Sequence, residues 1–294
     1  MGKSIFFKTI GLLYLVIAAC GAMIAGIICR IFDLNIGIAI LIVLGAAIPL
    51  TAIIFPILMS GEKNSKFGKL HTEFMTELSK NGYSERFLQI TEEAVNAHRN
   101  GENVGKVYLK DFVLYACDYY TLNGNYNKSL SLISNLNEFD FTGKSDTFID
   151  FGLSAMTYYS ALMDIYRGLN DKASASNMIG RAAFILNKDH KFETMNMGAE
   201  AIYYNYCMLI EDYERAGEYV QKLCSYTSAE AKKYFVRYYI EAEYDLYLGK
   251  RQEAVEALRK MEPVIADSKD LKAALEYFYQ MFQVRLGLRE EIQG

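Results

Sequence analysis

The residue types that could carry out chemistry are few and scattered in this chain of 294 residues. The three histidines, His71, His98 and His190, form no HExxH motif, and none has a cysteine or a second histidine close in sequence. The five cysteines contain no CxxC pair, which is the spacing typical of zinc sites and thiol redox centres. No glycine-rich phosphate loop and no G-x-S-x-G elbow occurs. We therefore predict no catalytic residues, no metal and no cofactor, and a protein that is not an enzyme.

Tyrosine is the residue type that stands out, with 23 Tyr in the chain and no Trp. Doubled tyrosines occur in four places, at residues 119–120, 158–159, 203–204 and 238–239. A tyrosine ring can fill the seam between two helices while its hydroxyl reaches water, and it can also line a binding groove. The sequence leaves both interpretations open.

Helices must position these tyrosines, because from residue 61 onward the chain reads as helix after helix with short polar breaks. The breaks repeat, and in each a turn residue is followed five residues later by a small one. The pairs are Gly124 with Ser129, Gly168 with Ala173, Glu211 with Ala216, and Gly249 with Ala254. A repeat of about 40 residues predicts stacked helical hairpins, because a single hairpin cannot bury its apolar face alone.

These breaks resemble the turns of the tetratricopeptide repeat family. The segment LGKRQEAVEAL, from Leu248, has a turn glycine followed by a helix with Ala at the tight crossing, and NGNYNKSLSLI matches it with Tyr126 and Ser129. The resemblance covers residues 66–261. The repeats are longer than the family's usual period of about 34 residues, and the Trp and Pro of its full consensus are missing. A related α-solenoid with the same stacking is the alternative.

In the family that the chain resembles, the first helices of the hairpins line a concave groove that holds a segment of a partner protein. Carried over residue by residue, the resemblance implies a groove made of Leu114, Asp118, Thr121, Tyr158, Leu162, Ile165, Ala201, Asn205, Met208, Tyr239, Glu243 and Leu246. A groove that mixes Tyr, Asn and carboxylate side chains suits a peptide with apolar and some basic character. The hypothesis fails if Tyr158, Asn205 and Tyr239 are all buried in helix seams.

The last stretch of the chain predicts a closing helix that begins at a cap on Asp267 or Ser268. Its apolar stripe consists of Leu271, Leu275, Phe278, Phe282 and Leu286. Terminal helices of stacked arrays cover the last exposed seam, which is the role that we expect for this one.

Two uncharged runs, residues 9–29 and 34–60, precede the repeats. Each is long enough to cross a hydrocarbon core of about 30 Å as a helix; the competing interpretation, a signal peptide, has a shorter apolar run. We therefore predict a transmembrane hairpin over residues 1–60 and a repeat domain over residues 61–294. Ala18, Ala22 and Gly26 recur every four residues, a spacing that lets membrane helices approach closely, against either the second span or another protein.

Basic residues flank the outer ends of these two runs, with Lys3 and Lys8 before the first and Lys63, Lys66 and Lys69 after the second. Because basic flanks mark the cytoplasmic side, both termini and the repeat domain are predicted to be cytoplasmic, on a bacterial cell membrane. The formal net charge of −4 does not favour nucleic-acid binding. The predicted partners are therefore a protein or peptide and the lipid bilayer, and the oligomeric state stays open.

Together these features predict an all-α protein with an N-terminal transmembrane hairpin, a tetratricopeptide-like α-solenoid of about five hairpins and a C-terminal capping helix. The predicted function is that of a non-catalytic, membrane-anchored scaffold or adaptor that binds a protein partner in its groove. The alternative is an accessory or assembly subunit of a larger membrane complex, of the transporter or secretion type, bound through the transmembrane hairpin. Partner binding by residues 61–294 alone favours the first function, and binding that needs the Ala18 face favours the second.

Overall fold

The computed structural model describes residues 10–20, 43, 47–51, 65–138 and 149–289. The chain divides into two compact units, one of residues 1–69 with 145–150 and one of residues 70–144 with 151–294. Every regular element in the described part is a helix, which agrees with the predicted all-helical repeat.

The first unit contains two described helical pieces, residues 10–20 and 47–51. Within the described residues, no helix has both the length and the apolar character that crossing a membrane requires. The prediction of a transmembrane hairpin is corrected by this finding and does not enter the proposals below. Of the predicted packing stripe, Ala18 is buried, and Ala22 and Gly26 lie outside the described residues.

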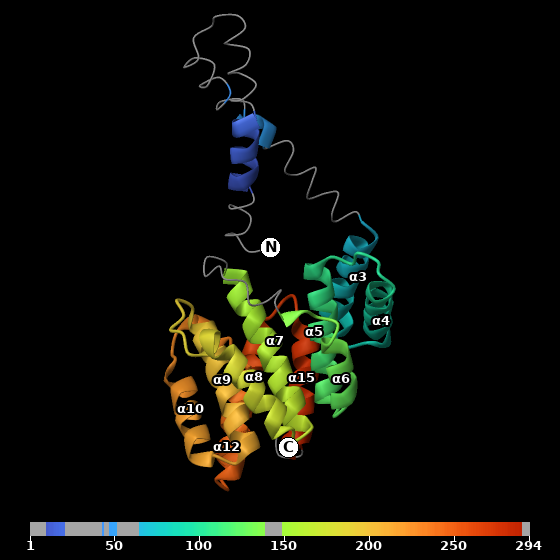
Figure 1. The fold of residues 1–294 in the computed structure, drawn as a ribbon. Coiled ribbons are helices and arrows are strands. Elements are labelled where there is room, and N and C mark those ends of the chain that lie inside the picture. The colour runs from blue at the N-terminus through green and yellow to red at the C-terminus, as the bar shows by residue number, and fades with distance from the viewer. Residues whose placement is uncertain (1–9, 21–42, 44–46, 52–64, 139–148, 290–294) are drawn as a thin grey trace, which may run out of the picture. The chain divides into compact units, whose positions relative to one another are not determined.

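The helices that follow are labelled in Figure 1 and belong to the second unit, except for residues 66–69 of α3 and 149–150 of α7. Their bounds are α3 Lys66–Asn81, α4 Glu85–Arg99, α5 Lys106–Leu122, α6 Tyr126–Ile133, α7 Ile149–Gly168, α8 Lys172–Leu186, α9 Glu193–Ile210, α10 Tyr213–Ser225, α11 Ala229–Lys232, α12 Val236–Tyr247, α13 Arg251–Arg259, α14 Met261–Asp267 and α15 Lys272–Leu286. Helices pack mainly against their neighbours in the chain, most extensively α5 with α6, α9 with α10 and α12 with α13. This is the contact pattern of stacked hairpins.

Short polar residues start several of the second helices, as the sequence pattern requires. The Ser84 hydroxyl accepts a hydrogen bond from the Phe87 amide at the start of α4, at 3.1 Å. The carboxylate of Asp171 accepts one from the Ser174 amide at the start of α8, at 3.0 Å. Such caps satisfy amide groups that the first turn of a helix leaves without a partner, each at about 1 kcal/mol.

The repeat register follows from the residues with left-handed backbone at the hairpin turns. In the four hairpins that begin with α5, α7, α9 and α12 these are Gly124, Asn170, Glu211 and Gly249, with φ of 75°, 54°, 67° and 75°. Five residues after them stand Ser129, Ala175, Ala216 and Ala254, all of which are fully buried. The predicted pair of Gly168 with Ala173 is wrong, because Ala173 is exposed and the turn residue of that hairpin is Asn170, an amino acid that tolerates left-handed backbone.

Gly168 has a different role from the one predicted. It ends α7, and a Cβ atom placed there would overlap the ring of Tyr126. The glycine therefore permits the close approach of the end of α7 to the start of α6. It marks a contact between neighbouring hairpins rather than a turn.

Glu211 is the unusual turn residue, because a side chain other than Gly or Asn in left-handed backbone is strained by roughly 1 kcal/mol. We expect Glu211→Gly to raise the free energy of unfolding by about 0.5–1 kcal/mol, even though it removes an exposed ion pair with Lys172. The measurement is urea denaturation followed by far-UV circular dichroism. As a matched control, Glu218→Gly, at an exposed position inside α10, should lower stability by about 1 kcal/mol. If both variants lose the same free energy of unfolding, the backbone at Glu211 is not strained.

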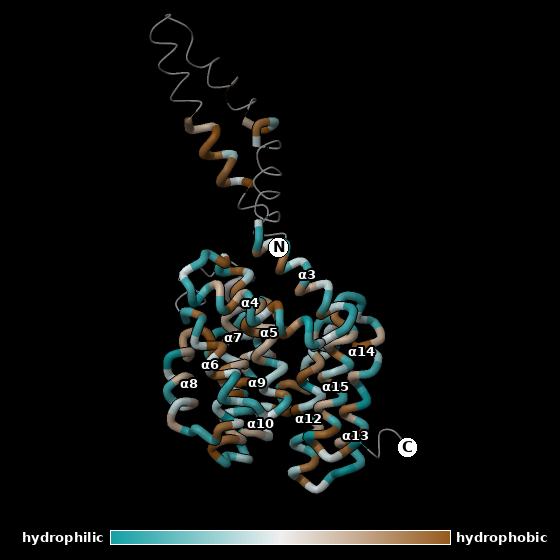
Figure 2. Tube along the Cα trace, turned by 90° about the vertical axis from the view of Figure 1, so that its right-hand side faces the viewer, coloured by the Kyte–Doolittle hydropathy of each residue, from teal (hydrophilic) through white to brown (hydrophobic). Residues whose placement is uncertain are grey.

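The apolar core fills the space between successive helices, and the tube in Figure 2 shows hydrophobic and hydrophilic residues alternating along them. One buried cluster joins α9 to α12 through residues such as Met197, Tyr204 and Ile240. A second cluster joins α12 to α15 and includes Leu258 and Phe282. Most of the doubled tyrosines belong to this packing, and Tyr159 and Tyr204 are fully buried.

The last helix, α15, packs on the last hairpin and also returns to the first ones. The Arg285 guanidinium donates from Nε to the Leu122 carbonyl at 3.2 Å and from Nη2 to the Thr121 carbonyl, and so binds the C-terminal end of α5. The Asn123 amide donates to the Tyr277 hydroxyl at 2.7 Å. The array is therefore joined to its own start by a helix that covers one side of its interior.

The start of α15 differs from the prediction. It begins at Lys272 after Leu271, which provides no side-chain cap. Asp267 instead ends the short helix α14, and Ser268 follows it. Pro263 lies in the first turn of α14, where its missing amide hydrogen does no harm.

Candidate functional site

A cavity of about 650 Å³ lies in the second unit among α5, α7, α9, α12 and α15. We call it the central cavity. Apart from Tyr126, its described lining residues come from the first helices of hairpins, from α15 and from the segment before α12. Its volume lies within the roughly 300–1,000 Å³ of sites that hold small molecules or single side chains with their flanking residues.

One side of the central cavity is aromatic. Phe235 and Tyr239 come from the α12 region, and Phe278 and Phe282 come from α15. The ring centroids of Phe235 and Phe278 are 5.5 Å apart, and those of Tyr239 and Phe282 are 4.1 Å apart. Because these rings pack against one another, the side formed by α12 and α15 is a fixed apolar surface.

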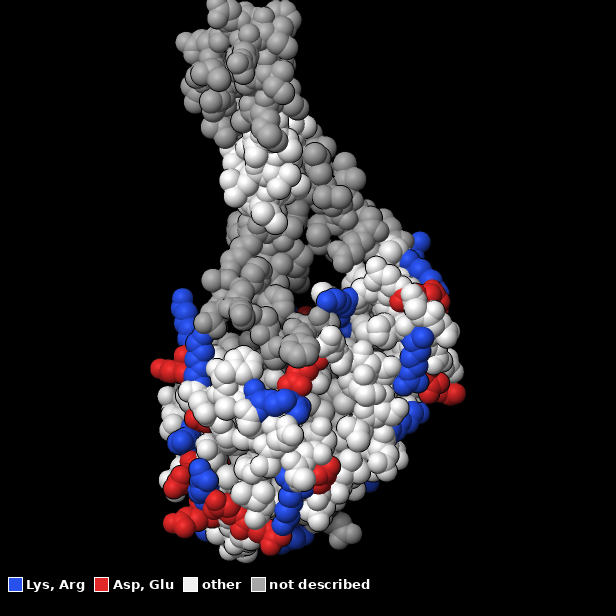
Figure 3. Space-filling model, viewed as in Figure 1, with Lys and Arg blue, Asp and Glu red and all other residues white. Residues whose placement is uncertain are grey.

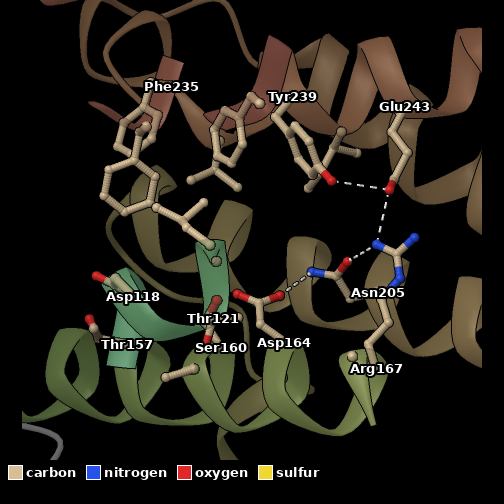
Figure 4. Close-up of a pocket in the computed structure, with 18 of the residues that line it drawn as sticks. Asp118, Thr121, Thr157, Ser160, Asp164, Arg167, Asn205, Phe235, Tyr239 and Glu243 are labelled. Atoms are coloured by element: carbon tan, nitrogen blue, oxygen red, sulfur yellow. Dashed lines mark hydrogen bonds and ion pairs between the residues drawn. The ribbon is translucent and has the colours of Figure 1, made fainter. Parts of the chain in front are cut away.

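The opposite side is polar, as Figure 4 shows. It consists of Asp118 and Thr121 from α5 and of Thr157, Ser160 and Asp164 from α7. The central cavity therefore presents an apolar wall facing a wall of hydroxyl and carboxyl groups. A ligand that fits it needs an apolar part and a polar or charged part.

The repeat places one polar side chain of each of four hairpins in this cavity at an equivalent position. Six residues before the left-handed turn residues stand Asp118, Asp164, Asn205 and Glu243, and all four line the cavity. The stacking of hairpins brings equivalent positions side by side. The result is a row of three carboxyl groups and one amide across α5, α7, α9 and α12.

Most of this row is held by hydrogen bonds within the protein. The Asn205 side chain donates to Asp164 at 3.1 Å and accepts from Arg167 Nη1 at 2.6 Å. Arg167 Nη1 also donates to Glu243 Oε2 at 2.9 Å. Because Arg167, Asn205 and Glu243 come from three successive hairpins, this network fixes the hairpins relative to one another as well as lining the cavity (Figure 4).

Two tyrosines complete the network around Glu243. Tyr204 donates to its Oε2 at 2.9 Å, and Tyr239 donates to its Oε1 at 3.2 Å. Burial and the adjacent Glu243 carboxylate raise the pKa of both phenols well above the ordinary value. Both tyrosines therefore act as hydrogen-bond donors at every physiological pH.

Asp118 is the exception in the row. Within the described part of the chain its carboxyl group has no hydrogen-bond or ion-pair partner. Burial raises the pKa of Asp118 to about 8, and the proximity of Asp164 adds to the rise. Burial also raises the pKa of Asp164, to about 6, against the opposing effect of Arg167 and Arg285. A carboxyl group without a partner in a cavity is a candidate for ligand recognition.

Comparison with protein-family models, curated proteins and solved structures finds no match for this chain.

The structure brings together five of the residues that the resemblance placed in a groove: Asp118, Thr121, Asn205, Tyr239 and Glu243 line the central cavity. Five others, Leu114, Tyr158, Leu162, Ile165 and Ala201, are buried in the core instead. Met208 and Leu246 are half-buried and pack against the core clusters. Of the three residues on which the groove hypothesis depends, Tyr158 is buried in the core, while Asn205 and Tyr239 line the cavity, and the groove itself stays a prediction.

The misplaced residues of α7 trace back to the wrong turn residue. Counting from Gly168 gives Tyr158, Leu162 and Ile165, whereas the same count from Asn170 gives Ser160, Asp164 and Arg167. All three of the latter line the cavity. Because Asn is also a common turn residue, a count from Asn170 predicts these three cavity positions from the sequence. Phe278, Phe282 and Arg285 carried no such signal, because α15 lies outside the repeat.

His71, Glu73 and His190 lie outside this cavity and each contacts a neighbouring group. His71 Nε2 lies 2.9 Å from Asp111 Oδ2, and Glu73 accepts from Arg86. His190 lies 2.8 Å from the Ile185 carbonyl. Across the described residues, no group of three or more His, Cys, Asp or Glu side chains is arranged to hold a metal ion.

Proposed function

We propose that the protein is a non-catalytic helical-repeat interaction module, related in architecture to tetratricopeptide repeats, that binds a segment of a partner protein in the central cavity. The observation that carries this proposal is the row of Asp118, Asp164, Asn205 and Glu243 facing an aromatic wall in one cavity. Equivalent positions of successive hairpins are the natural binding surface of a stacked array. The mixed polar and aromatic lining suits recognition of a peptide side chain and its neighbours.

The charge of the second unit is compatible with a protein partner. Figure 3 shows basic and acidic side chains interspersed over the visible face of this unit. Among the described side chains in that view, no continuous basic surface of the kind that follows a nucleic-acid backbone is present. Arg167 and Arg285, the two arginines in the cavity, are both engaged with protein groups.

The proposal predicts that filling the central cavity abolishes peptide binding without unfolding the protein. Thr157 is exposed and Ser160 is half-buried, and both line the cavity, so Thr157→Trp and Ser160→Trp place an indole in the cavity space. The intact chain is used to select short peptides from a displayed random library, and affinities are measured by fluorescence anisotropy. We expect both variants to bind the selected peptides at least about tenfold more weakly.

The matched control is Ala173→Trp, which adds the same indole at an exposed position of α8 that does not line the cavity. This variant should bind the selected peptides as the unmodified protein does. Circular dichroism establishes that all three variants are folded. Unchanged affinity in both cavity variants would exclude the central cavity as the binding site.

A further inference from the structure

Among the described residues that line the central cavity, both arginines bond to protein groups, while one carboxyl group does not. Arg167 is bound to Glu243 and Asn205. Arg285 is bound to the carbonyl groups at the end of α5. Three carboxyl groups line the same cavity, and Asp118 among them has no partner in the described part of the chain. The group that completes the cavity is therefore a cation rather than an anion.

The surroundings of Asp118 indicate what kind of cation this is. Figure 4 shows the Asp118 carboxyl on the same side as the Thr157 and Ser160 side chains, with the Phe235 ring on the opposite side of the cavity. An ammonium group has three donors, which match one carboxylate and neighbouring hydroxyl oxygens. An apolar stem attached to it can lie along aromatic rings, as lysine stems do on protein surfaces, and the rings attract the charge itself.

We propose that the occupant of the central cavity presents a lysine side chain, whose ammonium group pairs with Asp118 and whose methylene stem lies against Phe235 and Phe278. This inference rests on the proposed function and names the residue that the cavity selects. The chemistry that it requires is a protonated amine on an apolar stem. A free alkyl amine would share that chemistry, and the experiment below separates the two sources.

Binding of a cation at Asp118 is linked to proton release. The group whose charge raises the pKa of this carboxyl is Asp164 from α7. Tyr83 before α4 and Tyr115 and Cys117 on α5 also lie near it, and the Asp118 carboxylate adds to the raised pKa of each of them. Because burial raises the pKa of Asp118 to about 8, the carboxyl is largely protonated at neutral pH, and an ammonium group that pairs with it must displace the proton. Affinity for a lysine-containing peptide should therefore rise between pH 6 and pH 8.

The experiment begins with the peptides selected by the intact chain in the cavity-filling test. In each peptide, lysine is replaced either by norleucine, which keeps the stem and removes the charge, or by Nε-acetyl-lysine. We expect each replacement to weaken binding by at least about tenfold. Asp118→Asn should weaken binding of the lysine peptide to a similar extent and remove its dependence on pH, whereas Asp270→Asn, the same substitution at an exposed position, should change neither.

The outcomes separate this inference from the proposed function. Selected peptides that lack lysine, or that bind equally well with norleucine, overturn the lysine assignment, while their loss of binding to Thr157→Trp still supports the interaction module. If no peptide binds but 1,5-diaminopentane binds the intact protein and not Asp118→Asn, the cation is a free amine and the interaction module is wrong. If neither peptides nor 1,5-diaminopentane bind, both proposals fail.

Discussion

Asp118→Asn is expected to stabilise the protein by about 1–3 kcal/mol at pH 9 and to change its stability little at pH 4. The reason is the raised pKa of this carboxyl, about 8 in the folded protein against an ordinary value of 3.8. Between these values the folded state holds a proton that the unfolded state has lost. Stability of the unmodified protein therefore falls as the pH rises from about 4 to about 8, by at most ~1.4 kcal/mol per pH unit from this group.

Asparagine removes this dependence, because an amide of nearly the same shape carries no charge to bury. The measurement is urea denaturation of both proteins at intervals from pH 4 to pH 9, and the quantity compared is their difference in free energy of unfolding. Asp270→Asn is the control, since its side chain is exposed and its difference should be the same at both ends of the range. A constant difference for Asp118→Asn would mean that water reaches the carboxyl freely.

A residue that destabilises the folded protein and has no partner is difficult to explain by packing alone. Proteins retain such groups mainly at sites where function requires them. The three equivalent residues of the row each have a stabilising contact: Asp164 and Asn205 bond to each other, and Glu243 bonds to Arg167. This contrast between Asp118 and its equivalents is the physical argument for placing the ligand at the α5 end of the row.

The helical-repeat architecture could be predicted because it depends on local signals. A turn residue, a small residue five positions later and apolar stripes recur within each hairpin, and the structure places Ser129, Ala216 and Ala254 at fully buried crossings. The predicted turn residue of the α7–α8 hairpin, Gly168, lies two residues before the actual one, Asn170. Gly168 fits the same local pattern, but it is needed for close packing against Tyr126. Local sequence cannot distinguish a glycine needed for a turn from one needed for close packing.

The central cavity could not be predicted, because part of its wall comes from α15, whose position depends on contacts between distant parts of the chain. Arg285 binds the carbonyl groups of Thr121 and Leu122, and Tyr277 meets Asn123. Nothing in the apolar stripe of α15 indicates that it faces the first hairpins as well as the last. The transmembrane prediction rested on two long uncharged runs and on their basic flanks, and the described residues contain no helix that is long and apolar enough to cross a membrane.

Arg167→Met is expected to lower the free energy of unfolding by about 3 kcal/mol. The substitution keeps much of the apolar stem but leaves the Glu243 carboxylate without its cation, where Tyr204 and Tyr239 are its other partners. The side chains of Arg167 and Glu243 are only 25% and 18% exposed, so water compensates little for the loss. The same substitution also removes the donor to Asn205, which loosens three hairpins at once. Urea denaturation at pH 7 measures the effect.

The double variant Arg167→Met with Glu243→Gln separates the ion pair from the packing around it. The neutral amide carries no charge to bury, and its oxygen can accept from one of the two tyrosines while its NH2 group donates to the hydroxyl of the other. The double variant should therefore be more stable than Arg167→Met, with a coupling free energy of about 1–3 kcal/mol. Lys172→Met is the matched control, since it breaks the Lys172–Glu211 pair, whose side chains are 46% and 64% exposed, and should cost less than about 0.5 kcal/mol. If Arg167→Met lowers the free energy of unfolding no more than Lys172→Met does, the network lines the cavity without stabilising the fold. If the loss for Arg167→Met is several times larger, the side chains that line the cavity also hold α7, α9 and α12 in the arrangement that forms it.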